Sequence, residues 1–255
     1  SEMCIRDRPD GRRLGVRGIS NGKAASHNLV LFMCKPTIQK ERSVCKVNPI
    51  RLWGKLVHVR RDFKQFDDAE GRNLQLDDCT WGAIVGDAAK QRYRSLGISL
   101  EDVKKELLAV NNLALEGKPE DMVITSHICR GNYHSTFFTS GPYDTVADYV
   151  FANENVDALF LEYDDERSGG FAPLAKVSEN KKVVLGLITT KSPVLEDKEK
   201  VIARIHEAAK YVPLDRLCLS PQCGFASCEI GNKLTEEEQW AKLKLVKEIA
   251  EEVWS

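Results

Sequence analysis

Residues 158–162 read Ala158-Leu-Phe-Leu-Glu162, a short apolar run that ends in a carboxylate. Four other runs are also short and largely apolar, and longer amphipathic stretches separate them along the chain. These runs are Asn73-Leu-Gln-Leu-Asp77, Met122-Val-Ile-Thr-Ser-His127, Val183-Val-Leu-Gly-Leu-Ile188 and Arg216-Leu-Cys-Leu-Ser220. Short strands that alternate with helices predict repeated βα units and a parallel sheet.

The sequence predicts two of the helices in detail. The stretch from Glu199 to Tyr211 places Val201, Ile202 and Ile205 on one face, which is typical of an amphipathic helix. Thr235-Glu-Glu-Glu238 has the form of a capping box, in which the first and last side chains satisfy free backbone N–H groups at a helix start. The apolar residues that follow at three-to-four-residue spacing predict a long C-terminal helix.

Repeated βα units build either a closed barrel or an open, doubly wound sheet. No Gly-x-Gly-x-x-Gly motif follows any of the five predicted strands, so the phosphate loop of a dinucleotide-binding sheet is missing. We therefore predict a TIM-type (β/α)8 barrel. Because only five of its eight strands are readable, we expect the barrel to be incomplete or divergent at its N-terminal end.

Charge divides the chain of 255 residues into two parts. Residues 1–61 hold 14 Lys or Arg against 4 Asp or Glu, whereas the remainder is acidic. We treat 1–60 as an atypical basic segment, either non-native or a divergent first part of the barrel, and 61–255 as the C-terminal part of the barrel. Charge without interleaved aromatic residues is a weak sign of nucleic-acid binding, so no nucleic-acid partner is expected.

The longest apolar stretch, Leu29 to Cys34, is far shorter than the roughly 20 residues of a membrane span. The first residues also lack the apolar centre of a secretory signal, so we expect a cytoplasmic protein with no membrane partner. Thiols stay reduced in that compartment. The eight cysteines are then buried apolar residues, metal ligands or nucleophiles, and their context must decide which.

Each predicted strand finishes in residues that can do chemistry, and in a barrel these ends meet at one mouth. His127 and Cys129 are two residues apart on an extended segment, so their side chains point to the same face. Glu162 ends the next strand, and Cys223 follows the last one. Imidazole, thiolate and carboxylate groups together suit zinc rather than magnesium or calcium.

The wider pattern resembles the cobalamin-independent methionine synthase family, specifically short single-barrel proteins similar to its C-terminal catalytic domain. The resemblance covers roughly residues 61–255 and rests on five motifs in the family's order. The motifs are Leu74-Gln-Leu-Asp-Asp78, His127-Ile-Cys-Arg-Gly-Asn132, Leu161-Glu-Tyr-Asp-Asp-Glu-Arg167, Gly186-Leu-Ile-Thr-Thr-Lys-Ser-Pro193 and Leu219-Ser-Pro-Gln-Cys-Gly-Phe-Ala-Ser227.

The resemblance implies that zinc is held by His127, Cys129, Glu162 and Cys223, and that Asp77 holds the amino group of homocysteine. The implied reaction is transfer of the methyl group of a methyltetrahydrofolate, which can carry a polyglutamate tail, to homocysteine, forming methionine. Zinc would lower the pKa of the substrate thiol so that it attacks as a thiolate. Glu162, as the carboxylate ligand, is expected to exchange most easily when the substrate sulfur enters.

Three further residues are candidates around the substrate. Asp78 belongs to the same motif as Asp77, and the Trp81 ring could stack on a pterin. Lys191 stands where the full-length synthases have a histidine associated with proton delivery. This departure makes Lys191 the candidate catalytic acid and leaves the identity of the methyl donor open.

Two other hypotheses remain open from the sequence. One keeps the zinc thiolate chemistry but takes the methyl group from a corrinoid or another methylated donor. The other is an inactive barrel fragment whose zinc is structural, although structural sites usually bring sulfur ligands from close Cys-x-x-Cys pairs, and this chain has no such pair.

Overall fold

The computed structural model describes residues 28–33, 63, 67–68, 71–226 and 230–255. Its centre is a parallel sheet whose six strands follow one another in chain order. The strands are β1 (Asn28–Met33), β2 (Asn73–Asp78), β3 (Val123–Ile128), β4 (Ala158–Glu162), β5 (Lys182–Ile188) and β6 (Leu217–Pro221). All five pairings are parallel, so the carboxyl ends of the strands lie at one edge of the sheet.

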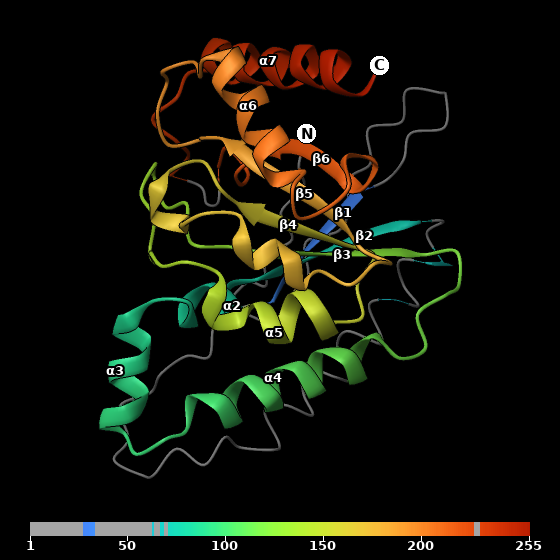
Figure 1. Cartoon of the computed structure of the whole chain (residues 1–255), viewed down its shortest axis with the longest axis vertical. Helices are drawn as coiled ribbons and strands as arrows, with labels where there is room; N and C mark the ends of the chain where they lie inside the picture. The colour runs from blue at the N-terminus through green and yellow to red at the C-terminus, as the bar shows by residue number, and fades with distance from the viewer. Residues whose placement is uncertain (1–27, 34–62, 64–66, 69–70, 227–229) are drawn as a thin grey trace.

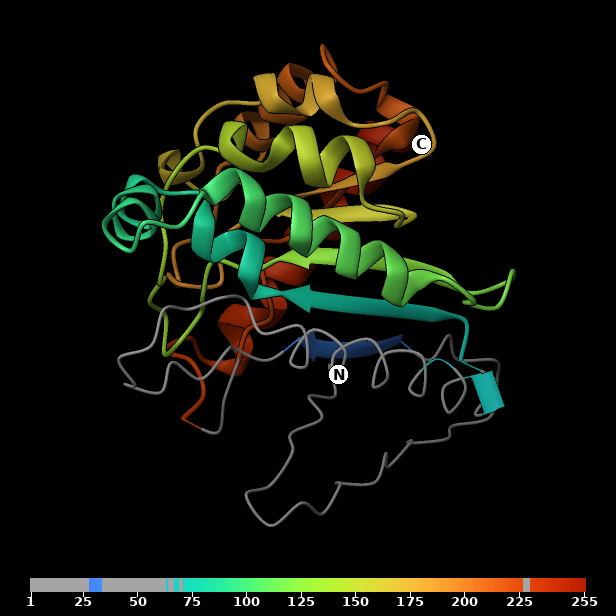
Figure 2. The same ribbon diagram turned by 90° about the horizontal axis from the view of Figure 1, so that it is seen from below.

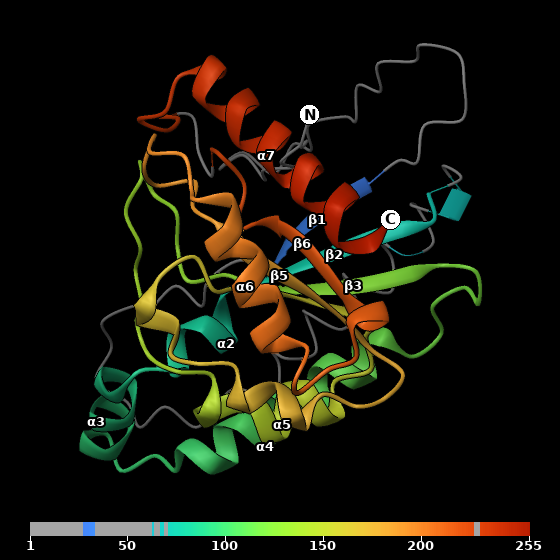
Figure 3. The same cartoon turned by 45° about the horizontal axis from the view of Figure 1, so that its top comes forward.

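Helices connect the strands and follow the sheet in chain order, from α4 below to α7 above in Figures 1 and 3. They are α2 (Cys79–Ile84), α3 (Asp87–Ser95), α4 (Leu100–Leu115), α5 (Asp144–Asn153), α6 (Lys198–Ala208) and α7 (Glu236–Trp254), with short 3-10 turns η1 (Glu166–Ser168), η2 (Ala172–Lys176) and η3 (Leu214–Arg216). Within the described part of the chain, none of the helices has both the length and the apolar character that crossing a membrane requires.

The five strands predicted from the sequence are present, each end falling within one residue of the prediction. The predicted capping box is also present: the Thr235 hydroxyl accepts from the Glu238 N–H, and the Glu238 carboxylate accepts from the Thr235 N–H. Strand β1 was not predicted. It pairs with β2 along its whole length and lies at one edge of the sheet in Figure 2, and the rest of the basic segment 1–60 lies outside the described residues.

The strand order argues against a doubly wound sheet but does not show a closed barrel. A doubly wound sheet reverses its order at a switch point, whereas here the order runs from β1 to β6 without reversal. Among the described residues, however, β1 and β6 are the two edges and do not pair, so the sheet is not closed. The structure therefore shows a parallel α/β fold, and the described residues do not confirm the (β/α)8 barrel that we predicted to be incomplete or divergent at its N-terminal end.

The two faces of the sheet have different roles, because successive side chains on a strand point to opposite faces. Leu74, Leu76, Leu159 and Leu161 lie on one face, are at most 2% exposed and belong to the apolar core. The opposite face is more polar, and the side chains on it that lie closest to the carboxyl ends are Asp77 on β2, His127 on β3 and Glu162 on β4. The functional groups predicted from the sequence thus share the face away from this core.

A buried polar network on the core face joins β2 to three helices. Asp78 accepts from the Thr80 N–H at 2.8 Å, which caps α2, and from the Asn111 amide at 2.9 Å. The same amide donates to Glu154 Oε1 at 2.7 Å, and the Trp81 indole donates to this oxygen at 3.3 Å. Burial, together with the nearby charge of Asp78, raises the pKa of Glu154 to about 7 against the lowering effect of its hydrogen bonds to Asn111 and Trp81.

The raised pKa of Glu154 predicts a pH-dependent stability. The folded-state pKa lies above the ordinary value of 4.5. The contribution of protonated Glu154 to the free energy of unfolding is therefore complete below about pH 4.5 and is lost as the pH rises through about 7. Glu154→Gln keeps the acceptor oxygen and has no charge to bury. By denaturant unfolding, we expect the variant to be more stable than the wild type by about 3 kcal/mol at pH about 8 and to show no such advantage at low pH. A stability difference that stays constant with pH would contradict this expectation.

Candidate metal centre

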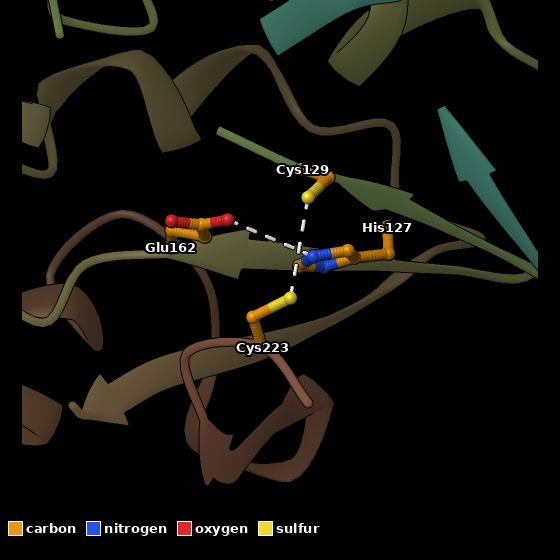
Figure 4. Close-up of side chains that lie close together, drawn as sticks. All are labelled: His127, Cys129, Glu162 and Cys223. Carbon is orange, nitrogen blue, oxygen red and sulfur yellow. Dashed lines mark hydrogen bonds and ion pairs between the residues drawn. The ribbon is translucent and has the colours of Figure 1, made fainter. Parts of the chain in front are cut away.

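Four side chains from the ends of three strands converge at the carboxyl edge of the sheet (Figure 4). His127 lies on β3, Cys129 directly follows β3, Glu162 ends β4, and Cys223 follows β6. One ligand atom from each residue lies within 4.8 Å of all the others. The structure therefore brings together all four residues that the sequence analysis placed around one ion.

The separations suit a four-coordinate metal ion. The Cys129 and Cys223 sulfur atoms are 4.0 Å apart, and His127 Nε2 is 3.7 Å from Glu162 Oε1. A tetrahedron with metal–sulfur bonds of about 2.3 Å has a sulfur–sulfur edge of about 3.8 Å. His127 Nε2 is buried and has no hydrogen-bond partner among the described residues, as expected of a nitrogen that coordinates an ion.

The protonation states of these groups depend on a cation. Contact with Cys223, together with burial, raises the pKa of Cys129 to about 12. Burial lowers the pKa of His127, but its contact with Cys129 and the charges of Asp77 and Glu162 outweigh burial and raise it to about 10. Two thiols in a buried acidic site stay protonated on their own, whereas a bound divalent cation favours thiolates and a neutral imidazole.

Glu162 is held from several sides although its side chain is 0% exposed. Oε1 accepts from the Arg130 backbone N–H at 2.8 Å, and Oε2 accepts from Arg167 Nη2 at 3.0 Å. Its backbone N–H donates to the Tyr143 hydroxyl at 2.9 Å. One carboxylate oxygen thus faces His127, and the other faces a guanidinium group, which fixes the orientation of the carboxylate.

The segment after β4 supplies the charges behind Glu162. Arg167 Nη2 also donates to Asp164 Oδ1 at 2.7 Å, and its other terminal nitrogen pairs with Asp165. Lys191, the candidate catalytic acid, places Nζ 3.9 Å from Glu162 Oε2 and 3.7 Å from Asp164 Oδ2. Its side chain is only 10% exposed, so the structure brings Lys191 to the same site as the four candidate ligands.

Hydrogen bonds between three loops place Cys223. The Asn132 amide donates to the Thr190 hydroxyl at 2.8 Å and to the Gly224 carbonyl. The Gln222 carboxamide oxygen accepts from the Thr190 N–H at 2.8 Å and from the Thr190 hydroxyl at 2.7 Å. These contacts tie the loops after β3, β5 and β6 together, so that the Cys223 thiol faces Cys129.

The predicted substrate-binding residues separate into two groups. Asp77 is 4% exposed, shares a face with His127 and pairs with it in the strand register. Burial raises its pKa to about 6, against the lowering effect of His127. Asp78 and Trp81 instead belong to the buried network on the core face, and Trp81 is 0% exposed. Their positions do not suit contact with a substrate, because the two-residue period of the strand turns Asp78 away from Asp77.

The sequence analysis missed Cys79 as a member of this region. Its sulfur lies within 4.8 Å of ligand atoms of Asp77 and Cys129. Cys79 follows Asp77 by two residues, the same spacing that pairs His127 with Cys129. Applying that spacing to the end of the first predicted strand would have identified it.

We predict that Arg167 stabilises the folded chain through Glu162 and Asp164. Arg167→Met leaves two carboxylates, 0% and 1% exposed, without their guanidinium partner. We expect a loss of about 3–5 kcal/mol in the free energy of unfolding of the metal-free protein. The matched control is Arg92→Met, at an exposed position of α3, where we expect a change within about 0.5 kcal/mol. Equal effects of the two variants on denaturant unfolding would contradict this role.

A parallel α/β protein with a histidine, two cysteines and a glutamate gathered at its carboxyl strand ends is a candidate metal-dependent enzyme. The family whose sequence profile matches residues 59–252 is described as "Cobalamin-independent synthase, Catalytic domain". The match covers most of the sequence, so the chain belongs to this family.

Two curated proteins are similar to most of this chain. The uncharacterized proteins YxjH and YxjG of Bacillus subtilis (strain 168) are 50% and 47% identical over 196 residues, which are 76% of this chain and 52% of each relative. The chain therefore spans about half the length of these curated relatives.

Two solved structures resemble the fold. One, from Listeria monocytogenes, carries a provisional assignment as a vitamin-B12 independent methionine synthase. It is 40% identical, with a TM-score of 0.62 over 78% of this chain and 54% of that one. The other is a B12-independent methionine synthase from Shewanella sp. W3-18-1 in complex with selenomethionine. It is 20% identical, with a TM-score of 0.60 over 82% of this chain and 56% of that one, and supports the fold alone.

Proposed function

We propose that this chain carries a zinc-dependent S-methyltransferase site that transfers a methyl group from a methyltetrahydrofolate to homocysteine and forms methionine. The observation that carries the proposal is the convergence of His127, Cys129, Glu162 and Cys223 within 4.8 Å at the strand ends. Family membership supports the reaction class. The four positions are also those that the resemblance assigned to the metal.

We propose further that the six strands belong to a (β/α)8 barrel. Support comes from the unbroken strand order and from the likeness to the two solved synthase structures. The pairing of β1 with β2 supports the interpretation of the segment 1–60 as a divergent first part of such a barrel. A barrel places the four candidate ligands around its mouth, where barrel enzymes carry their chemistry.

The donor set favours zinc over other common cations. Two sulfur ligands and one imidazole disfavour magnesium and calcium, which take oxygen ligands. When bound, zinc lowers the pKa of a thiol substrate so that the thiolate is available near neutral pH. The Gly131 N–H lies 3.4 Å from the Cys129 sulfur, a contact that favours the thiolate form of this ligand.

The protein residues would orient the substrate around this site. Asp77, whose carboxylate faces the cluster, accepts from the substrate amino group. Arg167 and the Arg130 N–H hold the Glu162 carboxylate, so that Glu162 keeps hydrogen-bond partners when the substrate sulfur takes its place. The substrate sulfur then forms a bond to the methyl carbon as the carbon–nitrogen bond breaks, and the tetrahydrofolate nitrogen receives a proton.

Lys191 is the candidate source of this proton because it reaches the site and its Nζ has no hydrogen-bond partner among the described residues. Its place between Glu162 and Asp164 also supports a second candidate function. In that function Lys191 only holds the two carboxylates, and the methyl donor is a corrinoid, which needs no proton on its leaving group. The two candidates share the thiol acceptor and differ in the donor.

The proposal predicts a thiol-specific, zinc-dependent substrate site. Zinc-loaded protein should bind homocysteine but not homoserine in calorimetry, because only the thiol becomes a strong zinc ligand. Cys223→Ser should weaken zinc binding by at least about 10- to 100-fold in a chelator competition, while Cys218→Ser on β6 should bind zinc like the wild type. Unchanged zinc binding by Cys223→Ser would remove this ligand. Zinc binding without homocysteine binding would favour a structural metal in an inactive fragment.

Turnover of the Lys191→Met variant with each of two methyl donors distinguishes the two candidate functions. With methyltetrahydrofolate, we expect this variant to lose about 10²–10⁴-fold in turnover, the usual contribution of a general acid. With methylcobalamin, it should retain wild-type turnover if Lys191 serves proton delivery alone. Methylation of homocysteine by the wild type with methylcobalamin only would overturn the folate proposal and support the corrinoid function.

A further inference from the structure

A second group of ligand atoms adjoins the candidate zinc site. Asp77, Cys79 and Cys129 each offer one ligand atom, and these three atoms lie within 4.8 Å of one another. Asp77 lies on the polar face of β2 near its carboxyl end, Cys79 begins α2, and Cys129 follows β3. The group therefore joins the carboxyl ends of the neighbouring strands β2 and β3, and it shares Cys129 with the first group.

The contacts inside this group leave acceptor capacity unused. The Cys79 sulfur and one carboxylate oxygen of Asp77 both lie within 4.8 Å of the Cys129 sulfur. Asp77 Oδ1 is buried in a residue only 4% exposed and has no hydrogen-bond partner among the described residues. A buried carboxylate oxygen without a donor is costly, and a cation beside it would remove that cost.

The donor set indicates the class of ligand. Two sulfur atoms and one carboxylate oxygen select a thiophilic divalent cation such as Zn²⁺ or Cd²⁺ and disfavour Mg²⁺ and Ca²⁺. Deprotonated Asp77 and Cys79 carry two negative charges, which balance one divalent cation. Three protein ligands leave one position of a tetrahedron free.

Cys129 belongs to both groups, and a thiolate sulfur has enough lone pairs to bridge two cations. Paired metal sites with ions about 3.5–4 Å apart are a known arrangement in enzymes. The bridging charge of Cys129 lies between the two ions and reduces their mutual repulsion. The Lys191 and Arg167 cations are near the Glu162 side of the first group, so they do not occupy the side of Asp77 and Cys79.

We propose that Asp77, Cys79 and Cys129 form a second site for a thiophilic divalent cation, bridged to the first site through Cys129. The functional consequence rests on the function proposed above, in which Asp77 holds the amino group of the thiol substrate. A cation at the second site occupies Asp77, so excess zinc competes with homocysteine and inhibits the enzyme.

The direct test is titration of the whole chain with Cd²⁺, followed by ¹¹³Cd NMR. Cys79→Ser should bind one equivalent less than the wild type and lose one resonance, while Cys218→Ser should match the wild type. Cys223→Ser should lose the other resonance and keep the one assigned to the second site. Equal stoichiometry and equal spectra for the wild type and Cys79→Ser would overturn the proposal.

The inhibition experiment separates this proposal from the proposed function. In the wild type, excess Zn²⁺ should raise the apparent KM for homocysteine, and Cys79→Ser should require at least about tenfold more Zn²⁺ for the same effect. An active wild type that excess Zn²⁺ inhibits to the same degree as Cys79→Ser would overturn the second site and leave the methyltransferase standing. An inactive wild type that still shows the Cys79-dependent Cd²⁺ site would overturn the methyltransferase and leave the second site standing.

Discussion

The alternation of side chains along a parallel strand is the constraint on which the site depends. Asp77 and His127 are register partners on neighbouring strands, and each points away from the leucine-rich core face. Glu162 shares its face with Phe160, the register partner of His127. A shift of any of these strands by one residue would turn its functional side chain into the core and an apolar side chain into the site.

Electrostatics gives this arrangement its chemical character. Contact with Cys223 and burial raise the pKa of Cys129. The contact with Cys129 lowers the pKa of Cys223, but burial and the charges of Glu162 and Asp77 outweigh it and raise this pKa, so both thiols stay protonated unless a cation is bound. Arg167 offsets part of the negative charge from outside the cluster, at 3.0 Å from Glu162. The site is therefore organised by the protein before any ion binds, and cation binding and thiol deprotonation are coupled.

Local sequence patterns predicted much of this arrangement. Apolar runs of strand length placed five of the six strands, and polar residues at the ends of these runs identified His127, Cys129 and Glu162. Cys223 was also found from its place just after the last predicted strand, but its exact position depends on hydrogen bonds among Asn132, Thr190 and Gln222 that no local pattern reveals. Strand β1 was missed because Asn28–Met33 is an isolated apolar run without an adjacent helical period.

The strand face separates the candidate substrate residues, which no local pattern revealed. Asp78 was a candidate because it shares a motif with Asp77, and Trp81 because its ring could stack on a pterin, yet both join a buried network with Asn111 and Glu154. Cys79 was missed although it follows Asp77 by the same two-residue spacing that pairs His127 with Cys129. Closure of the barrel also cannot be deduced from strand runs alone, since it depends on pairing between the first and last strands.

The central claim is that four separated residues coordinate one zinc ion and leave it open to a substrate sulfur. X-ray absorption at the zinc edge of the zinc-loaded chain tests it most directly. The account predicts two sulfur neighbours at about 2.3 Å and two nitrogen or oxygen neighbours at about 2.0–2.2 Å, with a third sulfur replacing an oxygen when homocysteine is added. A shell of nitrogen and oxygen alone, or one that homocysteine leaves unchanged, would contradict it.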